Sequence, residues 1–88
     1  MFHKIKSVEP ADNFVLKVTF ITMEKIEYDL KPLIENESRF AILKEDINKY
    51  AKVQVDSGGY GISWSDDIDL SAEEIWNNGE RKWKKKWI

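Results

Sequence analysis

The feature that most constrains the fold is a pair of alternating apolar segments joined by a very short connection. In residues 14–21 every second position, from residue 14 to residue 20, is apolar, and the other positions are partly polar, which fits a β-strand with one buried face. Residues 25–30 repeat this pattern. The alternating positions are Phe14, Leu16, Val18 and Phe20, then Ile26, Tyr28 and Leu30. Because a parallel crossover needs a dozen or more residues, the two segments are expected to form an antiparallel hairpin.

The flanking segments predict a further strand and a helical region. Residues 5–9 read as a short first strand, with Ile5 and Ser7 on one face. Between residues 33 and 51 the apolar spacing changes to three and four, which is typical of a helix. This stripe consists of Phe40, Leu43, Ile47 and Tyr50. Asp46 is a candidate N-cap within it, so one long helix and two short helices both fit.

The last third of the chain predicts a second hairpin and a final helix. Alternating apolar residues lie on both sides of Gly58-Gly59, as expected for two strands joined by a turn. Ser71 is a candidate N-cap, and Glu74 three residues later completes a capping box. Gly79 is expected to end this helix.

The order of these elements predicts an α+β fold. We expect a mostly antiparallel sheet of about five strands in two hairpin-like groups (β-β-β-α-β-β-α), with short helices packed on one face. The expected organisation is a single domain over residues 1–79 and a basic, tryptophan-containing tail over residues 80–88. The expected core includes Phe20, Leu30, Phe40, Leu43, Trp64 and Leu70.

Few residues suggest catalytic chemistry. The chain has no cysteine, and its one histidine, His3, is expected to be a solvated side chain near the N-terminus. An acidic stretch lacks the glycine and the spacing of a calcium loop, so it is expected to form a turn and the first turn of a helix. Its members are Asp66, Asp67, Asp69, Glu73 and Glu74. We therefore predict no catalytic residue, no bound metal and no cofactor.

The tail is the segment that most suggests binding. Residues 80–88 carry five basic side chains and one acidic one, a charge of +4, which leaves −6 on residues 1–79 within a total of −2. Such an acidic body disfavours general nucleic-acid binding. The candidate contact residues are Arg81, Lys82, Trp83, Lys84, Lys85, Lys86 and Trp87. The two tryptophans either fold back onto the sheet, contact a partner protein, or bind nucleic acid or a membrane surface.

The chain gives no sign of membrane insertion or export. Its longest apolar run, residues 40–43, is far shorter than the roughly 20 residues of a membrane helix. The basic residues near the N-terminus are not followed by an apolar segment of the kind found in signal peptides. We expect a cytoplasmic protein that does not contact membranes.

Three passages carry a resemblance to a known family. They are Val8-Glu9-Pro10 with residues 16–20 and 28–33; Phe40, Leu43, Ile47 and Tyr50 with residues 53–56; and Ile62-Ser63-Trp64 with Asp69-Leu70 and Ile75-Trp76. In order and spacing these residues resemble the bacterial family called domain of unknown function 2442, over about residues 5–76. That family often has an acidic residue and a glycine where this chain has Thr22-Met23-Glu24.

The resemblance implies a binding role rather than a reaction. Members are small stand-alone proteins, sometimes fused to a helix-turn-helix domain, and some are proposed as antitoxin-like partners of a small neighbouring protein. No catalytic residues are established for the family. Among the shared residues, Asp29 and Asp69 each precede a leucine, where a carboxylate either accepts a backbone N–H bond or binds a ligand.

The leading expectation is a non-enzymatic interaction module that binds another small protein. Val15 and Ile21 make the outer face of the second strand partly apolar, which fits either a dimer partner or a helix that covers this face. Of these two alternatives, a homodimer is slightly favoured. The alternatives are a nucleic-acid-associated regulator that uses the basic tail and a domain that binds a small ligand.

Overall fold

The computed structural model describes residues 3–81, which form two three-stranded antiparallel sheets and four α-helices. The first sheet has the order β1 (Ile5–Pro10), β2 (Val15–Phe20) and β3 (Lys25–Asp29). The second has the order β4 (Gln54–Val55), β5 (Gly61–Ser65) and β6 (Ile68–Ser71). The helices are α1 (Lys31–Asn36), α2 (Ser38–Glu45), α3 (Ile47–Tyr50) and α4 (Ala72–Asn78).

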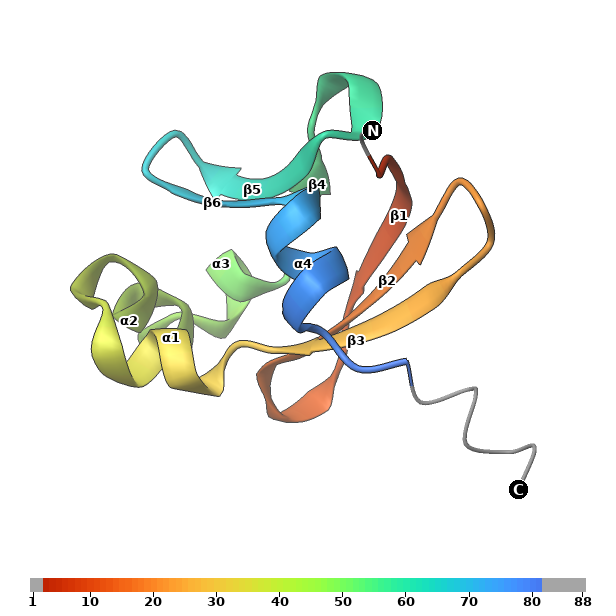
Figure 1. Cartoon of the computed structure of the whole chain (residues 1–88). Coiled ribbons are helices and arrows are strands. Elements are labelled where there is room, and N and C mark those ends of the chain that lie inside the picture. Colours follow the sequence, from red (N-terminus) through yellow and green to blue (C-terminus); the bar gives the residue numbers. More distant parts are fainter. Residues whose placement is uncertain (1–2, 82–88) are drawn as a thin grey trace.

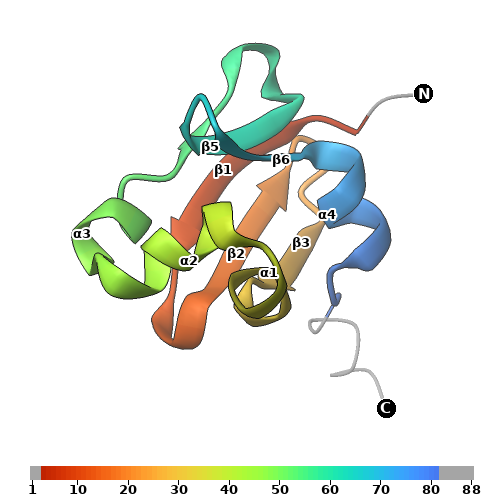
Figure 2. The same ribbon diagram turned by 90° about the vertical axis from the view of Figure 1, so that its left-hand side faces the viewer.

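The helices and the second sheet lie on one side of the first sheet (Figures 1 and 2). The predicted α+β class is confirmed, with six strands in the described part where about five were expected. The additional strand is β6, a short segment that follows the Asp66-Asp67 turn and pairs with β5. Short segments flanked by acidic turn residues give only a weak strand signal.

The predicted hairpin of β2 and β3 is present in the first sheet, with β2 as the central strand and β3 at the edge. Leu16 pairs with Tyr28, and Val18 pairs with Ile26, so their side chains share the inner face. The expected core residues Phe20, Leu30, Phe40 and Leu43 are fully buried, whereas Trp64 and Leu70 are partly buried and pack against the core. The alternation in the sequence therefore placed the correct face of the hairpin inward.

A β-bulge in β1 makes the predicted faces of this strand wrong. The pairing of β1 with β2 shifts register between Ile5 and Ser7. As a result Val8 lies opposite the buried Val18, while Ser7 is exposed. An inserted residue turns the following side chains to the opposite face, which a strict two-residue alternation does not anticipate.

The helical stripe is divided by Asp46, as one of the two alternatives predicted. The Asp46 side chain accepts hydrogen bonds from the backbone N–H groups of Asn48 and Lys49, and α3 begins directly after it. Because the new helix starts with a different rotational phase, Ile47 is 60% exposed rather than buried. Ile47 therefore does not share the buried face of the other members of the predicted stripe, Phe40, Leu43 and Tyr50.

Helix α4 connects the second sheet to the free edge of β3. Its first turn is capped by Ser71, whose Oγ accepts a 3.0 Å bond from the Glu74 N–H. The helix ends at Gly79, and Glu80 then exchanges two 2.8 Å backbone bonds with Glu27 of β3. Gly79 has no positive φ; it is needed because a Cβ there would lie 2.2 Å from Ile26 Cγ2.

Among the described residues no helix is long and apolar enough to cross a bilayer.

Candidate functional site

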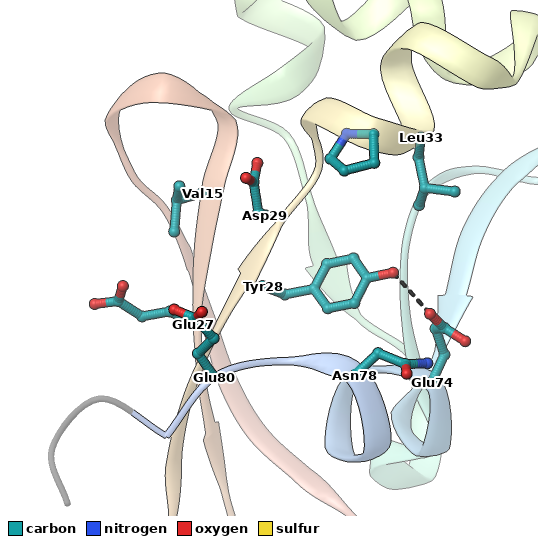
Figure 3. Close-up of a pocket in the computed structure, with 9 residues that line it drawn as sticks. Val15, Glu27, Tyr28, Asp29, Leu33, Glu74, Asn78 and Glu80 are labelled. Atoms are coloured by element: carbon teal, nitrogen blue, oxygen red, sulfur yellow. Dashed lines mark hydrogen bonds between the residues drawn. The ribbon is translucent and has the colours of Figure 1, made fainter. Parts of the chain in front are cut away.

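A pocket of about 460 Å³ lies at the edge of β3, between the start of α1 and the end of α4 (Figure 3). Its walls come from three distant parts of the chain, which α4 brings together through the Glu27–Glu80 bridge. The lining residues are Val15, Glu27, Tyr28, Asp29, Pro32, Leu33, Glu74, Asn78 and Glu80.

The pocket follows the edge of β3 rather than one face of the sheet. Alternation along the strand turns Tyr28 inward, so that only 6% of its surface is exposed, and turns Glu27 and Asp29 to the other side. All three still line the pocket because β3 is the last strand of the first sheet. Glu80 joins them by pairing with Glu27 at that edge.

The Tyr28 hydroxyl connects β3 to α4. It donates a 2.8 Å hydrogen bond to Glu74 Oε2. Burial raises the pKa of Tyr28 strongly, and the Glu74 carboxylate that accepts the hydrogen raises it further. Glu74 thus does not complete the predicted capping box: its N–H is bound to Ser71, but its carboxylate bonds to Tyr28. Tyr28 stays protonated and orients one carboxylate of the pocket.

Asp29 is held in place by the first residue of α1. Burial by itself would raise its pKa, but the N–H and the ammonium of Lys31 together hold the pKa below its ordinary value. The N–H bond is 2.9 Å and the ion pair is 3.0 Å. The prediction that Asp29 accepts a backbone N–H is confirmed. By contrast, Asp69 is exposed on β6, and within residues 3–81 no hydrogen bond to its carboxylate is found.

The pocket combines negative charge with an apolar wall. Four of its nine lining residues are acidic and none is basic, although Lys31 lies beside it and offsets part of the charge. Figure 3 shows the acids distributed around the Tyr28 ring, with Glu27 and Glu80 on one side and Glu74 on the other. Pro32 and Leu33 contribute apolar surface. Such a groove suits an extended segment that carries several cations and some apolar surface.

The family model for "Protein of unknown function (DUF2442)" matches residues 5–81. The chain belongs to the DUF2442 family. No curated protein and no solved structure matches the chain. The match extends beyond residue 76 and includes every residue that lines the acidic pocket of this DUF2442 domain.

Of the predicted tail contacts, only Arg81 lies in the described part of this DUF2442 domain. Its guanidinium donates to Glu24 Oε2 and to the Trp76 carbonyl oxygen, and lies 4.5 Å from the Trp76 ring centroid. The Arg81 and Glu24 side chains are 26% and 19% exposed. The other predicted contacts, Lys82, Trp83, Lys84, Lys85, Lys86 and Trp87, lie outside the described residues.

A second cluster lies on the other side of α4. The His3 ring stacks on Trp76 with 3.8 Å between centroids, and His3 Nδ1 is 3.0 Å from both Glu73 carboxylate oxygens. The His3 N–H also donates to Glu73 Oε2 at 2.8 Å. The expectation that His3 is a solvated terminal side chain is therefore wrong. We call the contacts of His3 with Glu73 and Trp76 of α4 the His3 lock. His3 and Glu73 also line a hollow of about 400 Å³, together with Tyr60.

The acidic stretch has the structural roles predicted for it. Asp66 and Asp67 form the turn between β5 and β6, while Glu73 and Glu74 lie in the first turn of α4. Within residues 3–81, no three histidine or acidic side chains are grouped so that they could hold a metal ion.

The acidic pocket was not predicted from the sequence, although parts of its signal were present. Alternation in β3 correctly separates Tyr28 from its acidic neighbours. The cap at Ser71 correctly places Glu74 in the first turn of α4. What no local pattern supplies is the contact between these elements, since Tyr28 and Glu74 are 46 residues apart.

Proposed function

We propose that this DUF2442 domain is a non-enzymatic interaction module whose acidic pocket binds a basic segment of another protein. The observation that carries the proposal is the grouping of four carboxylates in one pocket at the edge of β3, next to Tyr28 and an apolar wall. The acids supply attraction for lysine or arginine, and the wall accommodates their aliphatic stems or an adjacent apolar residue.

The fixed geometry of the pocket supports binding. Glu74 is oriented by Tyr28, Asp29 by Lys31, and the Glu80 backbone by two bonds to β3. Because the Glu74 and Asp29 carboxylates are already in place, they lose little conformational freedom when a cation arrives, and more of the interaction energy appears as affinity. Charges at the rim accelerate encounter with a positive partner and repel nucleic-acid phosphates.

The family context suggests the kind of partner. For DUF2442 proteins an antitoxin-like pairing with a small neighbouring protein is the specific form of this proposal. It requires that the partner present a basic segment of a few residues, because the pocket has a volume of about 460 Å³.

The proposal is tested by titration with a defined peptide. The full-length chain carries Lys82→Gln, Lys84→Gln, Lys85→Gln and Lys86→Gln, so that its own basic residues do not compete. The probe is a labelled peptide of alternating lysine and tryptophan, and the comparison peptide has glutamate in place of lysine. Fluorescence anisotropy should detect binding of the first alone, with an affinity that falls as salt is added.

A matched pair of variants locates the binding. Glu27→Gln with Glu80→Gln removes two pocket charges, whereas Glu45→Gln with Asp66→Asn removes two exposed charges elsewhere. The pocket pair should weaken binding of the basic peptide at least about tenfold, and the control pair less than about twofold. Equal affinities for the two pairs, or for the two peptides, would refute the proposal.

A further inference from the structure

The path of the backbone at the end of the described chain points away from the acidic pocket. Glu80 pairs with Glu27 in the antiparallel sense, so the chain that follows runs toward Lys25. Arg81 continues in this direction, because its guanidinium bonds to Glu24, which precedes β3. The Asp29 end of the pocket lies in the opposite direction along the strand.

Arg81 also restricts a return of the chain into its own pocket. Its guanidinium is fixed by the Glu24 carboxylate, the Trp76 carbonyl oxygen and the face of the Trp76 ring. Both partners lie away from the residues that line the pocket. A tail that entered the pocket of its own chain would have to reverse direction immediately after this anchored residue.

The residues beyond Arg81 match the pocket in chemistry. Residues 82–88 contain four lysines, two tryptophans and an isoleucine, and no acidic residue. The pocket is lined by four carboxylates and has an apolar wall at Pro32 and Leu33. Of the carboxylates, Asp29 pairs with Lys31 and Glu74 accepts a hydrogen bond from Tyr28. Seven extended residues span about 23 Å, which is enough to reach a neighbouring molecule.

We infer that residues 82–88 of one copy of the chain dock in the acidic pocket of a second copy. Each copy has one tail and one pocket, so two copies that exchange tails reciprocally close as a two-fold dimer. The two contacts reinforce each other, since formation of one holds the second tail near its pocket. This inference rests on the proposed function, because it assigns the chain's own tail as one basic occupant of the same pocket.

The test uses a charge swap measured by analytical ultracentrifugation. The tail-reversed chain carries Lys82→Glu, Lys84→Glu, Lys85→Glu and Lys86→Glu, and the pocket-reversed chain carries Glu27→Lys and Glu80→Lys. The unmodified chain should be a dimer that dissociates as salt rises from about 0.05 M to about 0.5 M. Each reversed chain alone should dimerise at least about tenfold more weakly. An equal mixture of the two should form a one-to-one heterodimer. One of its contacts joins the lysine tail to an intact acidic pocket, and the other joins the glutamate tail to a pocket that carries two introduced lysines beside Asp29 and Glu74.

The control chain, Glu45→Lys with Asp66→Lys, changes the net charge equally at two exposed sites outside the pocket and should remain a dimer. Circular dichroism of every variant verifies folding. If the pocket-reversed chain fails to fold, the tail-reversed chain still tests the inference, because its substitutions lie outside the described residues. A monomeric unmodified chain, a tail-reversed chain that stays dimeric, or folded reversed chains that fail to pair would overturn the inference. Peptide binding by a monomeric chain would overturn the dimer while leaving the proposed function standing.

Discussion

Two neighbouring glutamates in the first turn of α4 serve different regions of the molecule. Glu73 faces the His3 lock, where the backbone N–H and the ring of His3 account for the bonds to both Glu73 carboxylate oxygens. Glu74 faces the acidic pocket, where its carboxylate accepts a hydrogen bond from the Tyr28 hydroxyl. Three other carboxylates line the same pocket. One turn of helix therefore fastens the N-terminal segment on one side and concentrates negative charge on the other. This difference supports a structural role for the His3 lock and fits the binding role that we propose for the pocket.

The largest effect is expected from Gly79→Ala, which disturbs the point where α4 meets β3. An added Cβ would lie 2.2 Å from Ile26 Cγ2 and 2.8 Å from the Ile75 carbonyl oxygen, so the helix end must move. We expect a loss of about 2–4 kcal/mol in the free energy of unfolding. Urea denaturation measures it, with the exposed Asn77→Ala as a control that changes stability by less than about 0.5 kcal/mol. A loss below about 1 kcal/mol would show that the close approach is not tight.

Tyr28→Phe separates stability from binding on the pocket side. It removes the donor to Glu74 while keeping the buried ring, and should cost about 1–2 kcal/mol because the acceptor is charged. Tyr50→Phe is the matched control, since its hydroxyl donates to the neutral Ala11 carbonyl oxygen and its loss should cost about 1 kcal/mol. Only Tyr28→Phe should also weaken binding of the basic peptide, and equal peptide affinities for the two variants would contradict the assignment.

His3→Ala removes side-chain contacts of the His3 lock, on the other side of α4 from the pocket. It removes the stack on Trp76 and the ring contacts with Glu73, but keeps the backbone N–H bond. Because the His3 side chain is 28% exposed, we expect a loss of about 1 kcal/mol, less than for Tyr28→Phe. Peptide affinity should not change, so a His3→Ala chain with weakened binding would show that the two regions are coupled.

The smallest effects are two opposite dependences on pH. The pKa of Tyr28 is raised by burial and by Glu74, so its contribution to stability is complete below its ordinary value of 10.0 and declines above it. The pKa of Glu73 is lowered first by the His3 N–H, so its contribution is complete above its ordinary value of 4.5 and declines as pH falls.

Urea midpoints across the pH range of the folded protein distinguish these contributions. Tyr28→Phe should flatten the alkaline decline and Glu73→Gln the acidic one. Part of the alkaline decline should persist in Tyr28→Phe, because burial also raises the pKa of Tyr50, to about 12. Identical profiles for either variant and the unmodified chain would contradict the corresponding assignment.

The fold was predicted well from the sequence where the apolar side chains of a segment keep one spacing throughout. The alternation through Leu16, Val18 and Phe20 identified the buried face of β2, and Ser71 identified the start of α4. The failures occur where a single residue changes the period. The bulge after Ile5 turned Val8 inward, and the cap at Asp46 left Ile47 exposed. Both changes depend on local hydrogen bonding that overrides the pattern of apolar side chains.

The candidate site was harder to predict from the sequence than the fold. Its members come from β2, β3, α1, α4 and the residues after α4, and each looks ordinary in its own segment. Glu80 lines the pocket only because its backbone pairs with Glu27 at the edge of β3. The basic tail was the evident binding feature, whereas the pocket complementary to it required the tertiary arrangement.

The most direct test of binding at the acidic pocket is two-dimensional ¹H–¹⁵N NMR during peptide addition. The chain with its four tail lysines replaced by glutamine is titrated with the lysine–tryptophan peptide. We predict that the amide signals of Asp29, Leu33 and Asn78 move progressively, while those of His3 and Asp66 stay in place. Movement confined to the His3 side, or no movement at all, would contradict binding at the acidic pocket.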